Sequence, residues 1–286
     1  MTLAALALIL IAAFLHAGWN LLAKRSNGGA IFVWLFAACA CLIYGPFVAL
    51  LALAYPPHLD GLAWACVLAT SLLHLGYFLS LQRGYRSGDL SVVYPLARGT
   101  GPLLTMLLAV LLLNEQPSGL AVFGAGLIVA SVFILSGGPG NVARRPQPAA
   151  IGYGLLTGTL IASYTLLDKY AVSAVLVPPL LYDWLGNLGR TLLLTPYALR
   201  CRSQIAAEWR ANRNAIMGVA IMSPLAYILV LTAMTFTPVS YVAPAREVSI
   251  LIAVVLGARL LDEGALRSRL IAAVGMVCGI AALVLG

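Results

Sequence analysis

The chain has 286 residues, of which 62% are hydrophobic and only 9% are charged, and its formal net charge at pH 7 is +8. A soluble domain has about 25% charged residues, so this composition excludes an ordinary soluble enzyme, a disordered protein and a disulfide scaffold. The mean hydropathy of +0.99 indicates a polytopic helical membrane protein rather than an outer-membrane barrel, whose strands alternate apolar and polar residues.

Charge-free stretches separated by turn residues predict ten membrane-spanning helices, because one span needs about 20 apolar residues. The predicted spans are 3–23, 30–54, 61–82, 90–113, 118–136, 149–170, 179–199, 214–235, 238–260 and 265–285. The Gly- and Pro-rich segment 138–148 is the predicted linker between a first half, 1–137, and a second half, 149–286. We expect the helix at 90–113 to be interrupted, since it contains Pro95, Gly99, Gly101 and Pro102.

Basic residues in the loops and at the ends of the predicted spans lie almost entirely on one side of the membrane. The thirteen on that side are Lys24, Arg25, Arg83, Arg86, Arg144, Arg145, Arg200, Arg202, Arg210, Arg213, Arg259, Arg267 and Arg269, and the other side has Lys169 alone. Short cytoplasmic loops are enriched in Lys and Arg. We therefore expect a multi-pass protein of the cytoplasmic (inner) membrane with both termini on the extracytoplasmic side. Because the basic residues report orientation, we expect no nucleic-acid partner.

The two halves of the chain resemble each other. The segment Gly18-Trp19-Asn20-Leu21-Leu22-Ala23-Lys24 matches Ser163-Tyr164-Thr165-Leu166-Leu167-Asp168-Lys169, and Tyr77 matches Tyr227. Ala97-Arg98 is followed by Glu115 seventeen residues after the arginine, as Ala245-Arg246 is by Glu263. An odd number of spans per half inverts the second half, which is typical of secondary transporters with a site near the midplane. The sequence thus predicts an all-α polytopic fold of ten transmembrane helices in two inverted five-helix repeats.

One segment carries a family resemblance. Gly88-Asp89-Leu90-Ser91-Val92-Val93-Tyr94-Pro95-Leu96, followed by Pro102 and by Leu113-Asn114-Glu115, resembles the EamA-type branch of the drug/metabolite transporter superfamily. The resemblance covers the whole chain. It implies a ten-helix exporter of small metabolites with a central cavity lined mainly by the first, third, fourth, sixth, eighth and ninth helices. Similar members include exporters of amino acids, some of which handle aromatic amino acids and drugs.

Five charged residues lie inside predicted spans and away from the span ends: Arg98, Asp183, Arg190, Arg246 and Glu247. Such a residue costs roughly 2.5–3.5 kcal/mol at the bilayer centre, so it is usually paired or faces a cavity. Arg98 and Arg246 occupy equivalent positions in the repeat, and a planar guanidinium suits a substrate carboxylate. The alternative is that they pair with Glu247 or Asp183 and hold helices together. We expect Asp183 and Arg190, seven residues apart on one helix face, to form a structural pair or an interhelical bond.

Histidines and aromatic residues form the rest of the candidate substrate site. With Arg98, Arg246 and Glu247, the candidates are His16, Trp19, Asn20, His74, Tyr77, Tyr94, Tyr164, Tyr227 and Tyr241. His16 and Asn20 share a helix face, and a histidine there can couple transport to protons or stay neutral in an interhelical hydrogen bond. Tyrosine offers apolar area and a hydroxyl to a substrate, although ordinary packing explains any single aromatic residue equally well.

The remaining sequence motifs argue against certain kinds of site and do not indicate a further function. The five cysteines have no metal or disulfide spacing, and hydrolase, zinc-peptidase and P-loop motifs are absent from the sequence, so we expect no enzyme activity, no cofactor and no metal. Gly275 and Gly279 in the last helix favour close packing inside the bundle over a dimer contact, so a monomer is favoured over a dimer.

Together these features predict a secondary transporter that exports small metabolites across the cytoplasmic membrane by alternating access. Amino acids, aromatic ones included, are the leading substrate class, and proton coupling is an option. The expected partners are a small-molecule substrate and the lipid bilayer. Two alternatives are a multidrug exporter of apolar or cationic compounds and an intramembrane enzyme acting on lipid-linked substrates.

Overall fold

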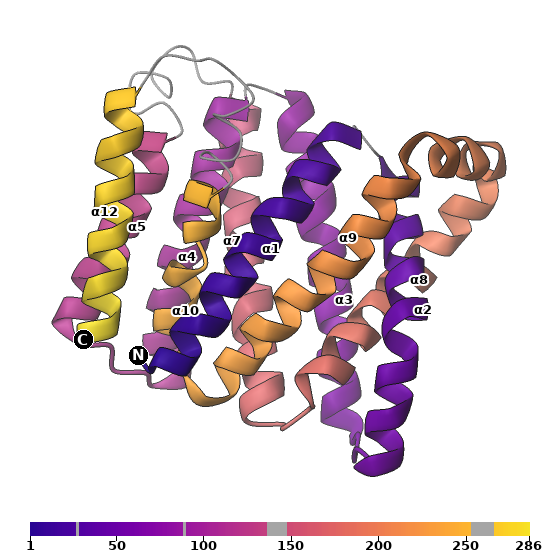
Figure 1. The fold of residues 1–286 in the computed structure, drawn as a ribbon, viewed down its shortest axis with the longest axis horizontal. Helices are drawn as coiled ribbons and strands as arrows, with labels where there is room; N and C mark the ends of the chain where they lie inside the picture. Colours follow the sequence, from indigo (N-terminus) through magenta and orange to yellow (C-terminus); the bar gives the residue numbers. More distant parts are fainter. Residues whose placement is uncertain (27–28, 88–89, 136–147, 253–265) are drawn as a thin grey trace.

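The computed structural model describes residues 1–26, 29–87, 90–135, 148–252 and 266–286. In these residues ten helices are assigned (Figure 1). They are α1 (Leu3–Ser26), α2 (Ala30–Ala54), α3 (Gly61–Ser87), α4 (Leu90–Leu113), α5 (Gly119–Leu135), α7 (Pro148–Ser173), α8 (Pro179–Arg200), α9 (Arg202–Phe236), α10 (Val239–Ala245) and α12 (Leu266–Leu285). The all-α fold class is therefore confirmed.

The outer surface of the bundle is apolar. In the described part of the chain, six helices are long and apolar enough to cross a membrane, namely α1, α2, α3, α4, α7 and α9. Large apolar side chains point outward, such as Leu42, which is 78% exposed, and Val277, which is 62% exposed. Exposed apolar side chains on this scale suit lipid and not water. The protein is therefore a multi-pass membrane protein.

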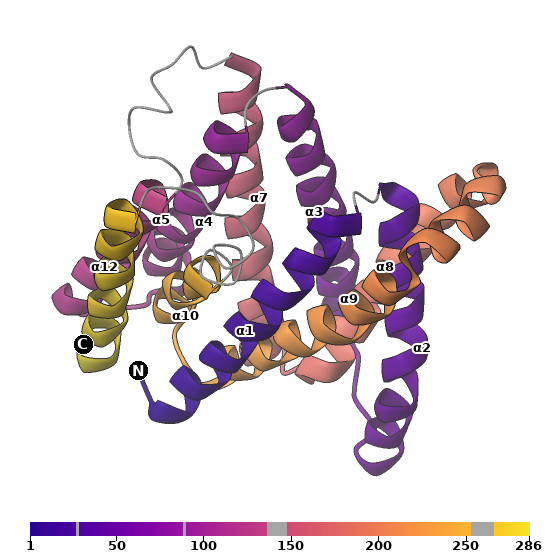
Figure 2. The same ribbon diagram turned by 45° about the horizontal axis from the view of Figure 1, so that its top comes forward.

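The helices pack in pairs that run across the bundle. The α5 and α12 helices lie side by side at one edge, and α2 packs against α8 at the other (Figures 1 and 2). Between these edges α3 packs along α7, and α1 packs along α9. Segments from the two halves of the chain are thus neighbours throughout the interior, and a site at the centre receives side chains from both halves.

Two glycines set the contact between α5 and α12. A Cβ atom on Gly124 would lie 2.6 Å from the carbonyl oxygen of Gly279, and a Cβ on Gly279 would lie 2.7 Å from the carbonyl oxygen of Gly124. The backbones touch there, as they do where small residues face each other in membrane helices. The packing expected for Gly279 is therefore internal to the chain.

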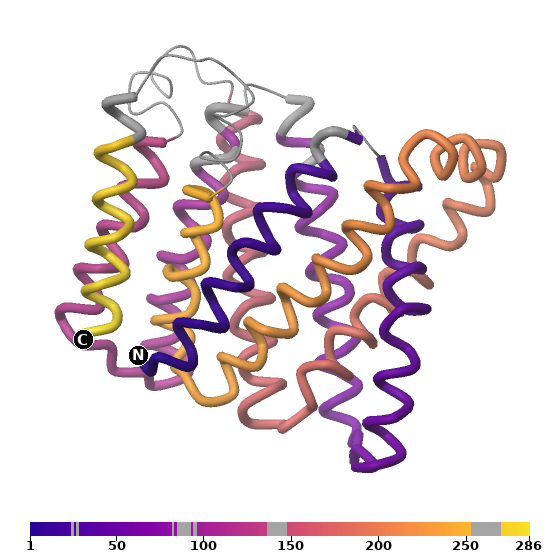
Figure 3. The backbone as a smooth tube through the Cα atoms, in the orientation of Figure 1, coloured from indigo at the N-terminus to yellow at the C-terminus, as the bar shows by residue number. Residues whose placement is uncertain are grey.

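The two termini lie at the same end of the bundle (Figure 3). The ends of α1 and α3 and the junction between α8 and α9 lie at the opposite end. These segments carry basic residues that we counted on the predicted cytoplasmic side, so in the described residues the alternation of spans agrees with that count. Which end faces the cytoplasm stays a prediction.

The corner between α9 and α10, at the end of the termini, is held by two charged side chains. The Lys169 ammonium donates to the carbonyl oxygens of Met234, at 2.6 Å, and Thr237, at 3.1 Å. The Glu115 carboxylate accepts from the backbone N–H groups of Val239, at 2.8 Å, and Ser240, at 2.9 Å. A cation thus meets the C-terminal carbonyls of α9 and an anion meets the first N–H groups of α10, as the helix dipoles favour.

Three expectations about helix boundaries are wrong. The α4 helix is continuous through its prolines, because membrane helices tolerate proline where neighbouring helices and threonine hydroxyls satisfy freed backbone groups. The segment 202–213, expected as a loop, is the first part of α9, which kinks at Asn212. The helix expected at 238–260 is interrupted after Ala245, where Glu247 N bonds to Pro244 O at 3.0 Å. Residues 138–147 of the predicted linker and 253–265 lie outside the described residues.

Candidate functional site

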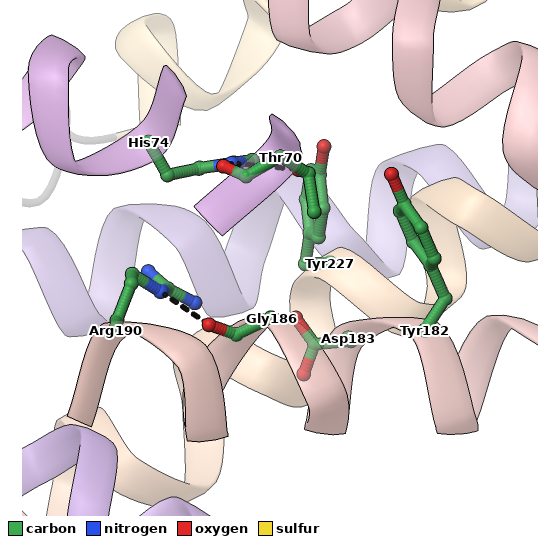
Figure 4. Close-up of a pocket in the computed structure, with 7 residues that line it drawn as sticks. All are labelled: Thr70, His74, Tyr182, Asp183, Gly186, Arg190 and Tyr227. Atoms are coloured by element: carbon green, nitrogen blue, oxygen red, sulfur yellow. Dashed lines mark hydrogen bonds between the residues drawn. The ribbon is translucent and has the colours of Figure 1, made fainter. Parts of the chain in front are cut away.

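Two small buried cavities lie at the centre of the bundle, and each is lined by side chains from both halves. The first is lined by Thr70, His74, Tyr182, Asp183, Gly186, Arg190 and Tyr227 (Figure 4). The second is lined by Arg98, Pro102, Thr105, Ile161, Tyr164, Thr165, Ala243, Arg246 and Glu247. Convergent polar groups in a buried concave region make this the candidate substrate site.

A cluster of aromatic rings contributes to the linings of both cavities. The His74 ring of α3 stacks on Tyr164 of α7 with centroids 4.1 Å apart, and it meets the edge of Tyr227 of α9 at 5.6 Å. Tyr77 meets the edge of Tyr164 at 5.8 Å. The Thr70 hydroxyl and carbonyl oxygens, each 3.0 Å from His74 Nδ1, hold the imidazole in place. The structure therefore brings four of the sequence-predicted site residues into one layer.

The two arginines of the repeat have different partners. Arg98 Nε lies 3.1 Å from Glu247 Oε2, with side chains 12% and 5% exposed, so Arg98 is held in an ion pair between α4 and the turn after α10. The Arg246 guanidinium lies over the Tyr227 ring, 5.4 Å from its centroid, in a cation–π contact. Within the described part of the chain, Arg246 has no carboxylate within 4.0 Å. The pairing expected as the alternative is therefore present for Arg98, whereas a substrate-binding role for Arg246 stays a prediction.

The charged groups of α8 are linked through an amide. Asn187 Nδ2 donates to Asp183 Oδ2 at 2.9 Å, and Arg190 Nη2 donates to Asn187 Oδ1 at 2.9 Å. Arg190 Nε also donates to the carbonyl oxygen of Gly186 at 3.4 Å (Figure 4). The expected Asp183–Arg190 pair is therefore bridged by Asn187 on the same helix face, and it orders the wall of the first cavity.

Asp168 of α7 is a buried carboxylate to which sequence reasoning assigned no role. Its side chain is fully buried. Oδ1 accepts a hydrogen bond from the Tyr182 hydroxyl at 2.7 Å, and Oδ2 accepts one from the Tyr227 hydroxyl. Both tyrosines line the first cavity, so Asp168 lies directly behind its wall. An acidic residue inside the predicted span 149–170 is itself a signal of function.

His16, Trp19 and Asn20 lie together on α1, which packs along α9. The His16 and Trp19 rings meet edge to face at 4.9 Å, and Asn20 Nδ2 donates to the His16 carbonyl oxygen at 2.7 Å. The Trp19 indole N–H is buried and has no acceptor among the described residues. His16 lies within electrostatic range of Arg98 and Arg246. A role for these α1 residues in binding stays a prediction.

Two further predicted residues lie differently. The Tyr241 hydroxyl accepts from Ser118 N at 3.3 Å and lies 3.3 Å from the Gly286 carbonyl oxygen, so Tyr241 ties the start of α10 to the start of α5 and to the C-terminus. These contacts give it a packing role. Tyr94 belongs to α4, but its side chain lies outside the described residues. No group of three or more His, Cys, Asp or Glu side chains in the described ranges could hold a metal ion.

Comparison with known proteins identifies the family. The model of the EamA-like transporter family matches residues 3–137 and again residues 148–285. One similar solved structure is a crystal structure of a protein whose sequence is 16% identical to this chain. The match covers 100% of this chain and 98% of the other chain, with a TM-score of 0.76. At this identity the likeness shows the fold alone. None of the curated proteins matches the chain. Because the two family matches span nearly all of its residues, the chain belongs to the EamA-like transporter family.

Proposed function

We propose that this protein is a secondary transporter that exports amino acids, aromatic ones included, across the cytoplasmic membrane by alternating access of two inverted halves. Membership of the EamA-like family supports a membrane transporter of small molecules. The substrate class follows from the chemistry of the central cavities, and the mechanism from the way in which helices of the two halves pair.

The observation that carries the proposal is the Arg246 guanidinium in the wall of the second cavity. Glu247 compensates Arg98 at 3.1 Å, whereas the contact described for Arg246 is the face of Tyr227. A planar guanidinium binds a carboxylate through two parallel hydrogen bonds. The neighbouring rings of Tyr164 and His74 offer a flat apolar surface on which an aromatic side chain can stack. A carboxylate beside an apolar or aromatic group describes an amino acid.

The pairing of helices supports alternating access. If the two five-helix halves exchange places, α1 exchanges with α7 and α3 with α9, so the α1–α9 contact becomes the α7–α3 contact. Both contacts are present, and the α2–α8 and α5–α12 pairs map onto themselves. This is the pattern expected of two halves related by a two-fold axis in the membrane plane, which place a midplane site between them.

The test is substrate transport by Arg246 variants in proteoliposomes. Uptake and counterflow of labelled amino acids are measured for the wild type, Arg246→Ala and Arg246→Lys at equal protein content. We expect Arg246→Ala to abolish transport and Arg246→Lys to retain part of it. Lysine keeps the positive charge but lacks the planar guanidinium that forms two parallel hydrogen bonds with a carboxylate.

Arg210→Ala is the matched control, since Arg210 is an exposed arginine whose Nε donates to Ala206 O of its own helix at 3.2 Å. It should transport as the wild type does. Normal transport by Arg246→Ala would remove this arginine from the site and with it the argument for a carboxylate substrate.

One observation favours the alternative, an exporter of cationic compounds. Aromatic rings surround the cavities and the Asp168 carboxylate lies behind them, which is a suitable environment for an organic cation. The same vesicles discriminate the two functions: transport of cationic dyes without transport of amino acids replaces our proposal with the alternative.

A further inference from the structure

We propose that Asp168 binds either a proton or the ammonium group of the substrate, in alternation, so that one proton is exchanged for each amino acid. This inference rests on the proposed function, because it requires a substrate that carries an ammonium group.

The first argument is the burial of Asp168 without a cationic partner. Its oxygens accept from the hydroxyls of Tyr182 and Tyr227, and no basic side chain in the described residues lies within 4.0 Å of it. The adjacent Lys169 directs its ammonium to the carbonyl oxygens of the α9–α10 corner. A fully buried carboxylate with only neutral donors is costly to keep ionised, and either a proton or a bound cation removes that cost.

The second argument is access from the cavity. Both hydroxyl donors of Asp168 line the first cavity, and in Figure 4 the rings of Tyr182 and Tyr227 extend in the same direction from their helices. A primary ammonium group has three donors. When it enters this cavity it can displace the Tyr227 hydroxyl and reach the Oδ2 atom that this hydroxyl occupies in the empty site.

The third argument is the arrangement of the two anchors around one side chain. Tyr227 has the Arg246 guanidinium over its ring and the Asp168 carboxylate at its hydroxyl. A zwitterion that bridges Arg246 and Asp168 would therefore lie across Tyr227, with its carboxylate at Arg246 and its ammonium group at Asp168. The site is thus complementary to both charged groups of an amino acid.

The groups around Asp168 come from every element packed near it. Ionisable or hydrogen-bonding side chains that interact with it are Cys66 and Thr70 of α3, Tyr164 of α7, Tyr182 and Asp183 of α8, Tyr227 of α9 and Arg246 after α10. Asp183 is the competing acid, but Asn187 bonds to it and connects it to Arg190. Among the residues that the structure describes, Asp168 has no such link to a cation, so we assign the proton exchange to Asp168.

The exchange balances in charge. With the substrate bound, the carboxylate is ionised and the ammonium group faces it. When the substrate leaves, one proton from water binds a carboxylate oxygen, and Tyr182 and Tyr227 keep their own hydroxyl protons. The next substrate releases that proton to water as its ammonium group arrives. Each state holds one positive equivalent at Asp168. The proton is taken up on the side where the substrate leaves and is released on the side where the next substrate binds, so the proton and the substrate move in opposite directions and the proton gradient can drive export.

The test is proton release on substrate binding to the purified full-length protein. Calorimetric titration with L-phenylalanine, and with the other amino acids in turn, is run in buffers of different ionisation enthalpy, which reports protons released per substrate. We expect the wild type to release a proton and its affinity to fall as the pH is lowered. Binding of 3-phenylpropionate, which has no ammonium group, should release none.

Asp168→Asn should lose both the proton release and the pH dependence of binding, with weakened affinity. Asp60→Asn, in which the altered residue caps α3 through Ala63 N at 2.8 Å, should behave as the wild type does, because asparagine caps a helix as well as aspartate. If Asp168→Asn releases as many protons as the wild type, the proposal is overturned. It is also overturned if proton release is lost in Asp183→Asn and kept in Asp168→Asn.

A measurement without substrate separates this inference from the proposed function. Infrared spectra recorded over a pH titration show the carbonyl band of protonated carboxyl groups, and we expect one component to be lost in Asp168→Asn. If no amino acid binds but this component is present, the proposed substrate fails while the proton site stands. If amino acids bind and the component is unchanged in the variant, the proton site fails while the proposed function stands.

Discussion

The buried Arg98–Glu247 pair makes the sharpest prediction about stability. Glu247→Gln removes the negative charge from a pair separated by 3.1 Å, whose side chains are 12% and 5% exposed. With an effective dielectric constant of about 20, the attraction at this separation is roughly 5 kcal/mol. Glutamine keeps the size but removes the carboxylate that compensates the buried Arg98 charge, so we expect a loss of about 3–5 kcal/mol in the free energy of unfolding.

A double-mutant cycle tests this reasoning. Glu247→Gln, Arg98→Met and the double variant are unfolded in mixed micelles by denaturing detergent, with the loss of helical circular dichroism as the signal. Because the double variant contains neither charge, we expect it to regain most of the stability that each single variant loses. Single losses that simply add up in the double variant would refute the pairing as an energetic unit.

Two other contacts give predictions for the same unfolding assay. Gly279→Leu forces side-chain atoms into the space of the Gly124 carbonyl oxygen, 2.7 Å from the added Cβ, so we expect little folded protein; Gly126→Leu, whose Cβ meets nothing within 4 Å, should fold normally. Lys169→Met removes charged hydrogen bonds to carbonyl oxygens, including Met234 O at 2.6 Å, and should cost about 1.5–3 kcal/mol. An unchanged stability would contradict the stabilising role of Lys169 at the α9–α10 corner.

The positions of the helices follow from the sequence wherever apolar length decides them. The bounds of α2 and α4 are those predicted, because charges and turn residues mark the bilayer edge. The first part of α9 was missed, since residues such as Glu208 and Arg210 are polar but form helix well. Hydropathy identifies the segments that lie in the membrane and does not identify helices as such. The polar part of a helix that continues beyond the apolar stretch is therefore not predicted.

The candidate site was predictable in composition but not in pairing. The sequence singled out every member of the central cluster, because polar and aromatic residues inside membrane spans often line functional sites. These members are His74, Tyr77, Tyr164, Tyr227 and Arg246. That Arg98 and not Arg246 pairs with Glu247 depends on the interrupted helix after α10. Asp168 stands beside Lys169 in the sequence, which makes it resemble the end of a span, whereas α7 continues to Ser173.

The clamp at the α9–α10 corner bears on the speed of transport. Glu115 and Lys169 contribute four charge-assisted hydrogen bonds there. Glu115 lies in the loop after α4 and Lys169 lies in α7, so the two side chains come from different halves of the chain. A movement that opens this end of the protein must either carry α4, α7 and the corner together as one body or break these bonds. If they break, the opening has a large activation enthalpy, and turnover becomes steeply dependent on temperature in one direction of the cycle only.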